Sequence, residues 1–204
     1  MANDGVDIEV KLSGSAGAWT SLQADLLNTV PVIVDYGISG NSPTDHMAKI
    51  GTITFALNNS GANSGAKLGY YTPGHANARA GFDLGIGARW RYDTGGSTYY
   101  KCQGKITDIQ PIPGAYRSRM TLVVVSDWLD DAANTKLRNV AVQIGQRADQ
   151  LLGTVAAAVN SPPPASSFDV ASMEFPYALD TVMDESTTAY QEMNKIVTSD
   201  WGFL

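Results

Sequence analysis

The feature that most constrains the fold of this chain is the recurrence of short segments in which every second side chain is of the same kind. One segment places Val30, Val32 and Val34 on one face and Ile33 and Asp35 on the other. This period of two belongs to a β-strand, whose successive side chains point to opposite faces. Because such segments recur at short spacing with turn residues between them, the sequence predicts a β-barrel or β-sandwich.

A second segment shows the same alternation and runs into an unusual connection. Ile53, Phe55 and Leu57 share one face, and the Asn-Asn-Ser-Gly run of residues 58–61 follows them. We attribute the turn there to Asn and Gly, which tolerate positive φ. Residues 61–81 are then rich in Gly, Ala and Asn. A connection of this length is usually functional or disordered, and the sequence leaves open whether it is ordered.

The next strands form a run of hairpins. Gly95-Gly96 offers a tight turn between a strand over residues 85–93 and another over residues 97–109. A Pro-Gly turn in residues 111–116 leads to an apolar strand that ends in Leu122–Val125. Because those last residues are continuously apolar, we expect that strand to be buried on both faces.

Helical patterns replace strand patterns after Ser126. The segment at residues 126–137 looks like a helical turn capped by Ser126 or Asp127. A longer helix is predicted from apolar residues at helical spacing, namely Ile144, Ala148, Leu151, Leu152, Val155 and Val159. The Pro-rich loop Ser161–Ser167 ends it. A last helix, with Ser186 as its candidate cap, carries the stripe Ala189, Tyr190, Met193, Ile196 and Val197.

The charge divides the chain at about the same place. Residues 1–128 carry ten Lys or Arg and ten Asp or Glu, whereas residues 129–204 carry four against ten, which accounts for the net charge of −6. We therefore expect one domain over residues 1–128 and another over residues 129–204. Neither has the basic face that nucleic-acid binding needs, so no specific nucleic acid is expected. No run approaches the roughly 18 apolar residues of a membrane span.

Few residues suggest chemistry. Cys102 lies in a predicted strand and is expected to be a buried, reduced, inert thiol. His46 and His75 lie in separate loop-like stretches, so a four-ligand zinc site with this one cysteine is not expected. We assign no catalytic, cofactor-binding or metal-binding residue, and we expect no enzyme activity.

Two groups of acidic residues allow a functional interpretation as well as a structural one. Asp127, Asp130 and Asp131 could form a calcium loop, but they lack the alternating pattern of one, so helix capping is preferred. Asp184 and Glu185 could suggest a glycosidase pair. Such carboxylates lie about 5 to 10 Å apart across a cleft, which adjacent residues cannot do, so a solvated helix start is preferred.

The aromatic residues of the strand region offer a possible binding surface. Tyr70, Tyr71, Trp90, Tyr99 and Tyr100 could stack on sugars or bases. Half of the residues on a strand face the core in any case, so packing is the competing interpretation. An aromatic β-surface would fit a host-receptor or carbohydrate-binding module.

The order of these elements resembles the N-terminal region of tail-hub proteins, also called baseplate-hub or minor tail proteins, of long-tailed bacteriophages. The family's Gly-x-Ile-x-x-Ile-x-Pro hairpin, apolar strand and short helix are matched by residues 103–132, "QGKITDIQPIPG…RSRMTLVVVSDWLDDA". Further similarity lies in residues 18–27, 30–38, 50–61, 85–93 and 184–204. Two departures are the connection at residues 61–81 and the end of the chain. Trp201–Leu204 looks like the start of a strand, so we expect a longer protein or completion by partners.

The resemblance implies a structural protein of the virion rather than an enzyme. Residues 1–128 would form a tail-tube-like antiparallel β-barrel or sandwich, and residues 129–204 an α+β hub domain, possibly incomplete. Hubs are homo-oligomers, usually trimers, that close the distal end of the tail tube. Their partners are the tail tube, distal tail, tape-measure and tip or fibre proteins. The expected location is the tail tip of the virion, after synthesis in the cytoplasm of the bacterial host.

Overall fold

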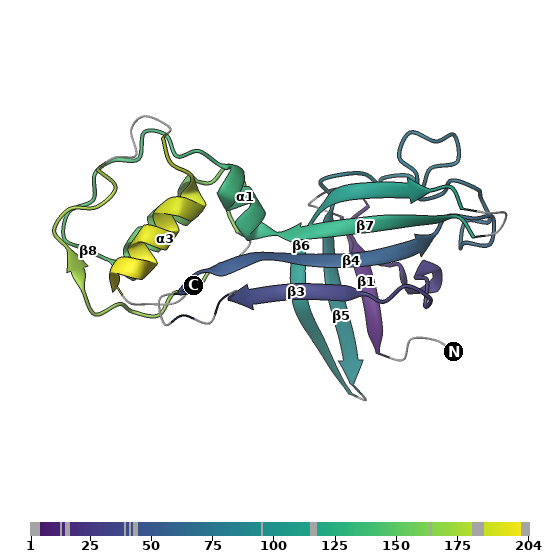
Figure 1. Ribbon diagram of the computed structural model, residues 1–204, viewed down its shortest axis with the longest axis horizontal. Helices are drawn as coiled ribbons and strands as arrows, with labels where there is room; N and C mark the ends of the chain where they lie inside the picture. The colour runs from purple at the N-terminus through teal and green to yellow at the C-terminus, as the bar shows by residue number, and fades with distance from the viewer. Residues whose placement is uncertain are drawn as a thin grey trace. The chain divides into compact units, whose positions relative to one another are not determined.

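The chain folds into two compact units, each with its own hydrophobic core. The first comprises Met1–Asp35 and Gly51–Asp127, and the second Tyr36–Ile50 and Trp128–Leu204. The computed structural model, drawn in Figure 1, describes residues 5–12, 14, 17–38, 40, 42, 45–94, 96–114, 118–163, 165–180 and 186–200. The division at Asp127 and Trp128 separates the strand region from the helices, and the short stretch 36–50 groups with the helices.

In the described part of the chain, seven strands form one sheet in the order β2-β1-β5-β6-β7-β4-β3. They are β1 (Val6–Val10), β2 (Thr20–Ser21), β3 (Ile33–Ile38), β4 (Ala48–Asn58), β5 (Gly87–Thr94), β6 (Ser97–Ile112) and β7 (Met120–Asp127). Every strand pair whose register is defined in the described residues is antiparallel. With three helices elsewhere, this confirms the predicted fold class, mainly antiparallel β with a helix-containing part.

The long strand β6 belongs to both halves of the sheet. Its residues from Ser97 to Lys105 pair with β5, and those from Gly104 to Ile112 pair with β7. The pairing of β6 with β7 shifts register between Ile106 and Asp108, which marks a β-bulge. A bulge bends its strand and increases the local twist. The bent strand therefore turns the sheet so that its two halves enclose one core.

Residues 22–27, which lie outside the strands, also connect the β1 half of the sheet to the β4 half. The backbone N–H of Leu22 donates to the carbonyl of Ile8 in β1 at 2.8 Å, and that of Leu27 donates to Ala56 in β4 at 2.9 Å. The 3-10 helix η2 (Gln23–Asp25) lies between these two anchor points. This segment links the β1 side of the core to the β4 side without adding a ladder of its own.

The predicted alternation of the strands is largely right. Ile53, Phe55 and Leu57 are fully buried. The expectation that Leu122–Val125 is buried on both faces is wrong, because of these four residues only Val123 and Val125 are buried, whereas Leu122 and Val124 are half-buried. Within the described residues, the second face of β7 is not covered by a second layer, so the outward side chains of Leu122 and Val124 stay partly exposed.

Two turns differ from the sequence-based expectation. The strand β6 continues through Pro111 to Ile112, so the predicted turn at residues 111–116 starts too early. Proline is tolerated there because this end of β6 has β7 as its neighbour and β5 stops earlier. At residues 58–61 the turn is real but needs no positive φ. Its hydrogen bond is from the backbone N–H of Ser60 to Oδ1 of Asn58, at 3.0 Å.

The strand β1 was not predicted. It alternates charged Asp7 and Glu9 with Val6, Ile8 and Val10, and both faces are largely buried. A short strand with charges on one face looks like an exposed terminal segment in sequence. Its place in the sheet, between β2 and β5, comes from long-range pairing that no local pattern reveals.

Within its described residues, the second unit contains three helices and a small two-stranded sheet. Its elements are α1 (Trp128–Asn134), α2 (Ala148–Ala158), α3 (Ala189–Asp200), β8 (Gln146–Arg147) and β9 (Glu174–Phe175). The predicted helical stripes form its core, in which Leu151, Val155 and Ala189 have no exposed surface. No helix in the described residues is long and apolar enough to cross a membrane.

Three details of the helix predictions need correction or stay open. Ile144 lies before α2 and is 66% exposed, so it is not part of the helical stripe. The cap of α3 is Thr188 rather than Ser186, because the Thr188 hydroxyl accepts from the N–H of Gln191 at 3.3 Å. Asp127 ends β7 and its carboxylate accepts from the N–H of Gly51 at 2.8 Å, so its capping of α1 stays a prediction. Trp201–Leu204, the predicted strand start, lies outside the described residues.

Candidate interaction surfaces

The long connection of the first unit, residues 59–81, is held in place by hydrogen bonds to a buried residue, and we call it the 59–81 strap. At its centre the Tyr71 ring is fully buried. The Tyr71 hydroxyl donates to Oδ2 of Asp25 in η2, and Nη1 of Arg79 donates to the same hydroxyl at 2.8 Å. Ser64 donates to Asp25 twice, from its backbone N–H at 2.6 Å and from Oγ at 2.5 Å. One carboxylate therefore gathers groups from different parts of the strap.

The electrostatics keep the Tyr71 hydroxyl protonated. Burial raises the pKa of the Tyr71 hydroxyl well above its ordinary value, and the hydrogen bond to Asp25 raises it further. The hydroxyl therefore remains a donor toward Asp25 at neutral pH. The guanidinium of Arg79 lies over the rings of Tyr70 and Tyr71, at 5.6 and 5.8 Å from their centroids. A charge-assisted network of this kind fixes the geometry of a loop that lacks regular structure.

Asparagine side chains organise the base of the strap. Oδ1 of Asn59 accepts from the N–H of Tyr71 at 2.8 Å, while its Nδ2 donates to Oγ1 of Thr72 at 2.7 Å. Nδ2 of Asn63 donates to the carbonyl of Lys67 at 2.8 Å. These bonds replace the ladder partners that the backbone of a strand would have. The Asn content that marked this stretch in the sequence is thus used to pair its backbone.

A set of ion pairs covers the face of β1 that points away from the core. Glu9 accepts from Nε of Arg89 at 2.6 Å and from Nη1 of Arg91 at 2.7 Å. Arg91 also pairs with Asp93 at 2.9 Å and approaches Asp7 at 3.6 Å. Burial raises the pKa of the Asp7 carboxyl above its ordinary value. The alternating arginines of the sequence are therefore explained by carboxylates of a strand that the sequence analysis missed.

Aromatic rings extend this charged face. The guanidinium of Arg89 lies 4.1 Å from the centroid of the Trp19 ring and 3.9 Å from that of Tyr100. Nζ of Lys11 lies over the same Trp19 ring at 4.9 Å. Stacking of this kind fixes Arg89 between two rings. Part of the aromatic surface is thus already used by contacts within the chain.

The structure separates the aromatic residues that the sequence grouped together. Tyr71 is buried in the strap and cannot form a binding surface, which corrects the sequence-based suggestion. Tyr70 packs edge-on against it at 5.2 Å, and Trp90 is half-buried against the sheet core. Tyr99 and Tyr100 remain exposed, at 46% and 53%. Of the five aromatic residues that the sequence grouped, only these two, on one strand, are available for a surface role.

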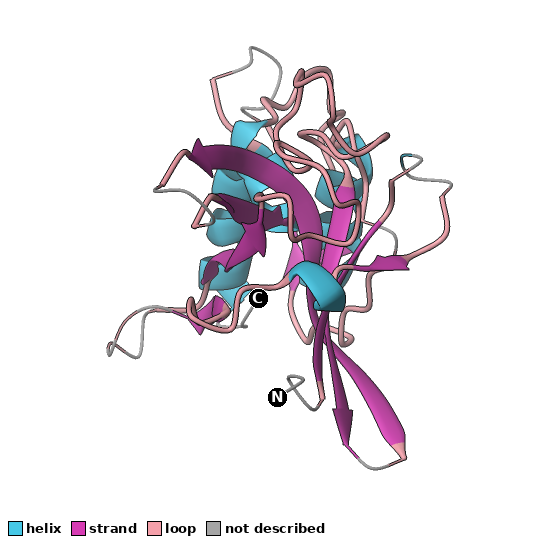
Figure 2. Cartoon of the chain, turned by 90° about the vertical axis from the view of Figure 1, so that its right-hand side faces the viewer, coloured by secondary structure: helices cyan, strands magenta, loops and turns pink. Residues whose placement is uncertain are grey.

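Several strand edges of the sheet have no strand neighbour in the described part of the chain, among them one on β6 and one on β3. Residues from Ser97 to Gln103 of β6 pair with β5 on one side only. Figure 2 shows β5 and β6 as a hairpin that projects from the rest of the sheet. The strand β3 stands at the end of the strand order, and its Ile33 is 55% exposed. An open edge with exposed apolar residues is a template for pairing with another chain.

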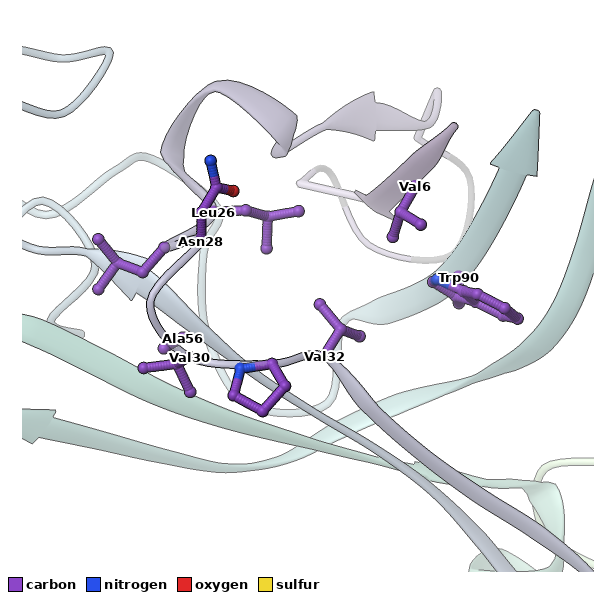
Figure 3. A pocket seen from close by; sticks show the side chains of 9 residues that line it. Val6, Leu26, Asn28, Val30, Val32, Ala56 and Trp90 are labelled. Atoms are coloured by element: carbon purple, nitrogen blue, oxygen red, sulfur yellow. The ribbon is translucent and has the colours of Figure 1, made fainter. Parts of the chain in front are cut away.

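A small pocket lies beside the connection that leads into β3, and Figure 3 shows its lining. It has a volume of about 220 Å³. Its lining residues carry no charge and are Val6, Leu26, Leu27, Asn28, Val30, Pro31, Val32, Ala56 and Trp90. An engineered apolar cavity of about 150 Å³ is large enough for benzene, so this pocket has room for one apolar side chain.

The residues considered for chemistry are dispersed. Cys102 is half-buried, and burial with the nearby Asp127 charge raises the pKa of its thiol to about 11, which fits the expected unreactive state. His46 is buried in the second unit, and His75 is exposed in the strap. Among the described residues, no group of three or more His, Cys, Asp or Glu could hold a metal ion. Asp184 and Glu185, the weighed carboxylate pair, lie outside the described residues.

The chain shares its fold with solved tail proteins. The 43 kDa tail protein of prophage MuSo2 from Shewanella oneidensis matches 96% of this chain with a TM-score of 0.53 and 13% identity. A tail protein from Neisseria meningitidis MC58 matches 95% of it with a TM-score of 0.53 and 12% identity. The chain covers 49% and 45% of those two proteins, about half the length of each. No family model and no curated protein matches the sequence.

Proposed function

We propose that this chain is a structural protein of a bacteriophage tail tip, acting as a hub at the distal end of the tail tube. It assembles into a ring, with a trimer as the expected state, and joins the tail tube, distal tail, tape-measure and tip or fibre proteins. Its place is the virion, after synthesis in the cytoplasm of the host. The observation that carries the proposal is the fold shared with two tail proteins over almost the whole chain.

Within this proposal the two parts of the chain have different roles. Residues 1–128 act as the tail-tube-like domain that forms the wall of the ring. Residues 129–204 act as the hub domain. The curved sheet supports the first role, because a bent wall suits a ring. The change from strands to helices at Trp128 supports the boundary.

The open edges of the sheet supply a route to a ring. The edge of β6 from Ser97 to Gln103 and the edge of β3 are different surfaces of one molecule. Contact between unlike surfaces of identical subunits is head-to-tail, and it closes into a ring when the rotation allows. A dimer with two-fold symmetry would instead use the same surface twice.

The first test is the molar mass in solution, measured by light scattering on a sizing column over a series of concentrations. A closed ring of defined stoichiometry is the expected result, either for this chain alone or after its tail partners are added. A strict monomer under both conditions would contradict the proposal.

Edge variants test the head-to-tail arrangement. Tyr99→Lys and Ile33→Lys each place a charge on one of the two open edges, so each should abolish the ring. A mixture of the two variants should give heterodimers, because one intact copy of each edge remains. Tyr177→Lys, at a Tyr that is 71% exposed in the second unit, is the matched control and should leave the ring intact. Loss of assembly in the control, or no heterodimer in the mixture, would contradict this arrangement.

The alternative function is a host-receptor or carbohydrate-binding module of the tail. The exposed Tyr99 and Tyr100 favour it, since aromatic rings stack on sugars. Arg89 already covers one face of the Tyr100 ring, which reduces the surface left for a sugar. A screen of the protein against glycans decides between the two functions. Binding that is lost in Tyr99→Ala would favour the module over the hub.

A further inference from the structure

The 59–81 strap is built differently from the sheet that it adjoins. Its backbone bonds are mostly turn contacts, such as those from Ala66 to Asn63 at 2.9 Å and from Thr72 to Gly69 at 3.1 Å. Two bonds of longer sequence separation, from Gly69 to Asn59 at 3.2 Å and from Arg79 to Tyr70 at 2.7 Å, join its ends to its middle. Tyr71 is its only large apolar side chain without exposed surface. The strands of the sheet instead have continuous ladders and supply most of the core that Tyr71 joins. A segment with few buried apolar groups opens at lower free energy than a core strand.

The contacts of the strap converge on one carboxylate. Asp25 has 3% of its surface exposed and lies outside the strap, in η2. It holds Ser64 through the backbone and the hydroxyl, and Tyr71 through its phenol group. Arg79 joins the far part of the strap to the same point through the Tyr71 hydroxyl. Loss of the Asp25 carboxylate would therefore release both parts of the strap together.

We infer that the 59–81 strap is a latched segment that opens and closes as one unit, independently of the sheet, with the Asp25 carboxylate as its latch. In the closed state the Tyr71 ring of the strap packs edge-on against the Phe82 ring with centroids 5.0 Å apart, and both residues are buried. Opening uncovers these rings while the strand ladders stay paired. Opening of the strap is a property of the isolated chain, so its test does not depend on the proposed tail function.

Hydrogen exchange of the full chain at neutral pH tests this directly. The reporters for the strap are the amides of Ser64, Gly69, Tyr71 and Arg79, all of which donate in the closed state. The reporters for the sheet are the paired amides of β4 and β7. We expect the strap amides to exchange with one common protection factor, at least about tenfold below that of the sheet. Equal protection in strap and sheet would overturn the inference.

Variants identify the latch. Asp25→Asn keeps the shape of the side chain but removes its charge and one acceptor oxygen. It should speed exchange of all strap amides by at least about tenfold, because hydrogen bonds to charged groups are the stronger kind. Sheet amides should change much less. Asp83→Asn is the control, since the exposed Asp83 accepts from the adjacent N–H of Leu84.

A second variant keeps the test decisive if Asp25→Asn fails to fold. Tyr71→Phe removes only the hydroxyl that links Asp25 to Arg79, and the ring still fills its place. It should speed exchange at Arg79 as well as at Ser64, although Ser64 makes no contact with that hydroxyl in the bonds described above. Faster exchange at Arg79 alone would show that the two parts open separately. Uniformly faster exchange across strap and sheet would show that Asp25 and Tyr71 only stabilise the whole unit.

Discussion

The two units of the chain are stabilised in different ways. The helical unit buries mainly apolar side chains, with His46, Thr135, Thr187 and Glu192 as its buried polar residues in the described part of the chain. The sheet unit buries a larger polar set, consisting of Asp7, Glu9, Asp25, Asn59, Ser60, Asn63, Thr121 and Ser126. Helices satisfy their own backbone, whereas the irregular segments of the sheet unit need side chains as partners. The sheet unit therefore depends on individual polar contacts and close backbone approaches as well as on its core.

The largest expected effect is that of Gly81→Ala in the sheet unit. Gly81 has a φ of +77°, and an added Cβ would lie 1.7 Å from the carbonyl oxygen of Leu12, a backbone atom that cannot rotate away. We expect a loss of at least about 3 kcal/mol in the free energy of unfolding, from strain and forced separation of the backbones. Urea unfolding followed by tryptophan fluorescence measures it.

Gly61→Ala is the matched control for this prediction. Nothing lies within 4 Å of a Cβ at Gly61, and its φ is not positive. It should change the stability by less than about 0.5 kcal/mol. Similar midpoints for the two variants would show that the approach of Gly81 to Leu12 does not matter.

Leu151→Ala tests how much the helical unit depends on its apolar core. Leu151 is fully buried in the core that α2 and α3 share, so truncation leaves a cavity. We expect a loss of about 2–5 kcal/mol, seen by circular dichroism of the helices. Leu84→Ala, at a leucine that is 57% exposed, is the control. If Leu151→Ala lowers the stability of the sheet unit as much as that of the helical unit, the two units unfold together. They would then differ in the composition of their interiors but not in their stability.

The helices were predictable because their information is local. The stripe from Ala148 to Val155 repeats with the period of a helix, and α2 covers it. The strand β4 was also visible from its alternation and turn residues, and β7 from its continuously apolar run. Boundaries such as Pro111 were wrong because a proline on an unpaired edge stays within a strand.

The interior contacts of the sheet unit could not be predicted in the same way. Asp25 and Tyr71 are 46 residues apart, and nothing in either local sequence marks the other as its partner. The pairing of Glu9 with Arg89 and Arg91 required the strand β1, which itself depends on the sheet. The alternating arginines were a usable signal, because a strand face with repeated charge predicts a neighbouring strand of opposite charge.

A pH series compares the two units through their carboxylates. Burial raises the pKa of Asp7, so just above the ordinary value of 3.8 the folded chain holds this proton while the unfolded chain loses it. The contribution of Asp7 to stability therefore falls as pH rises through that window. In the helical unit, the hydrogen bond from Arg147 lowers the pKa of Asp149, so its contribution rises with pH through the region below 3.8.

The variants Asp7→Asn and Asp149→Asn should accordingly show opposite trends. As pH rises from about 4 to about 6, the stability of Asp7→Asn relative to the original chain should increase, whereas that of Asp149→Asn should decrease as pH rises from about 2 to about 4. Urea midpoints at each pH measure both differences. Equal slopes for the two variants would mean that neither environment shifts its carboxyl as described.

The smallest expected effect is chemical and leaves the fold unchanged. The thiol of Cys102 has a pKa raised from 9.0 to about 11 by burial and by the charge of Asp127. Because the thiolate is the reactive form, alkylation by iodoacetamide at pH 8 should be about 100-fold slower than for an ordinary thiol. The same chain unfolded in guanidinium chloride is the reference, since it has the same cysteine without its surroundings. A folded-state rate within about threefold of that reference would show that β6 opens at Cys102 often enough to expose the thiol, and that the folded surroundings do not suppress its reactivity.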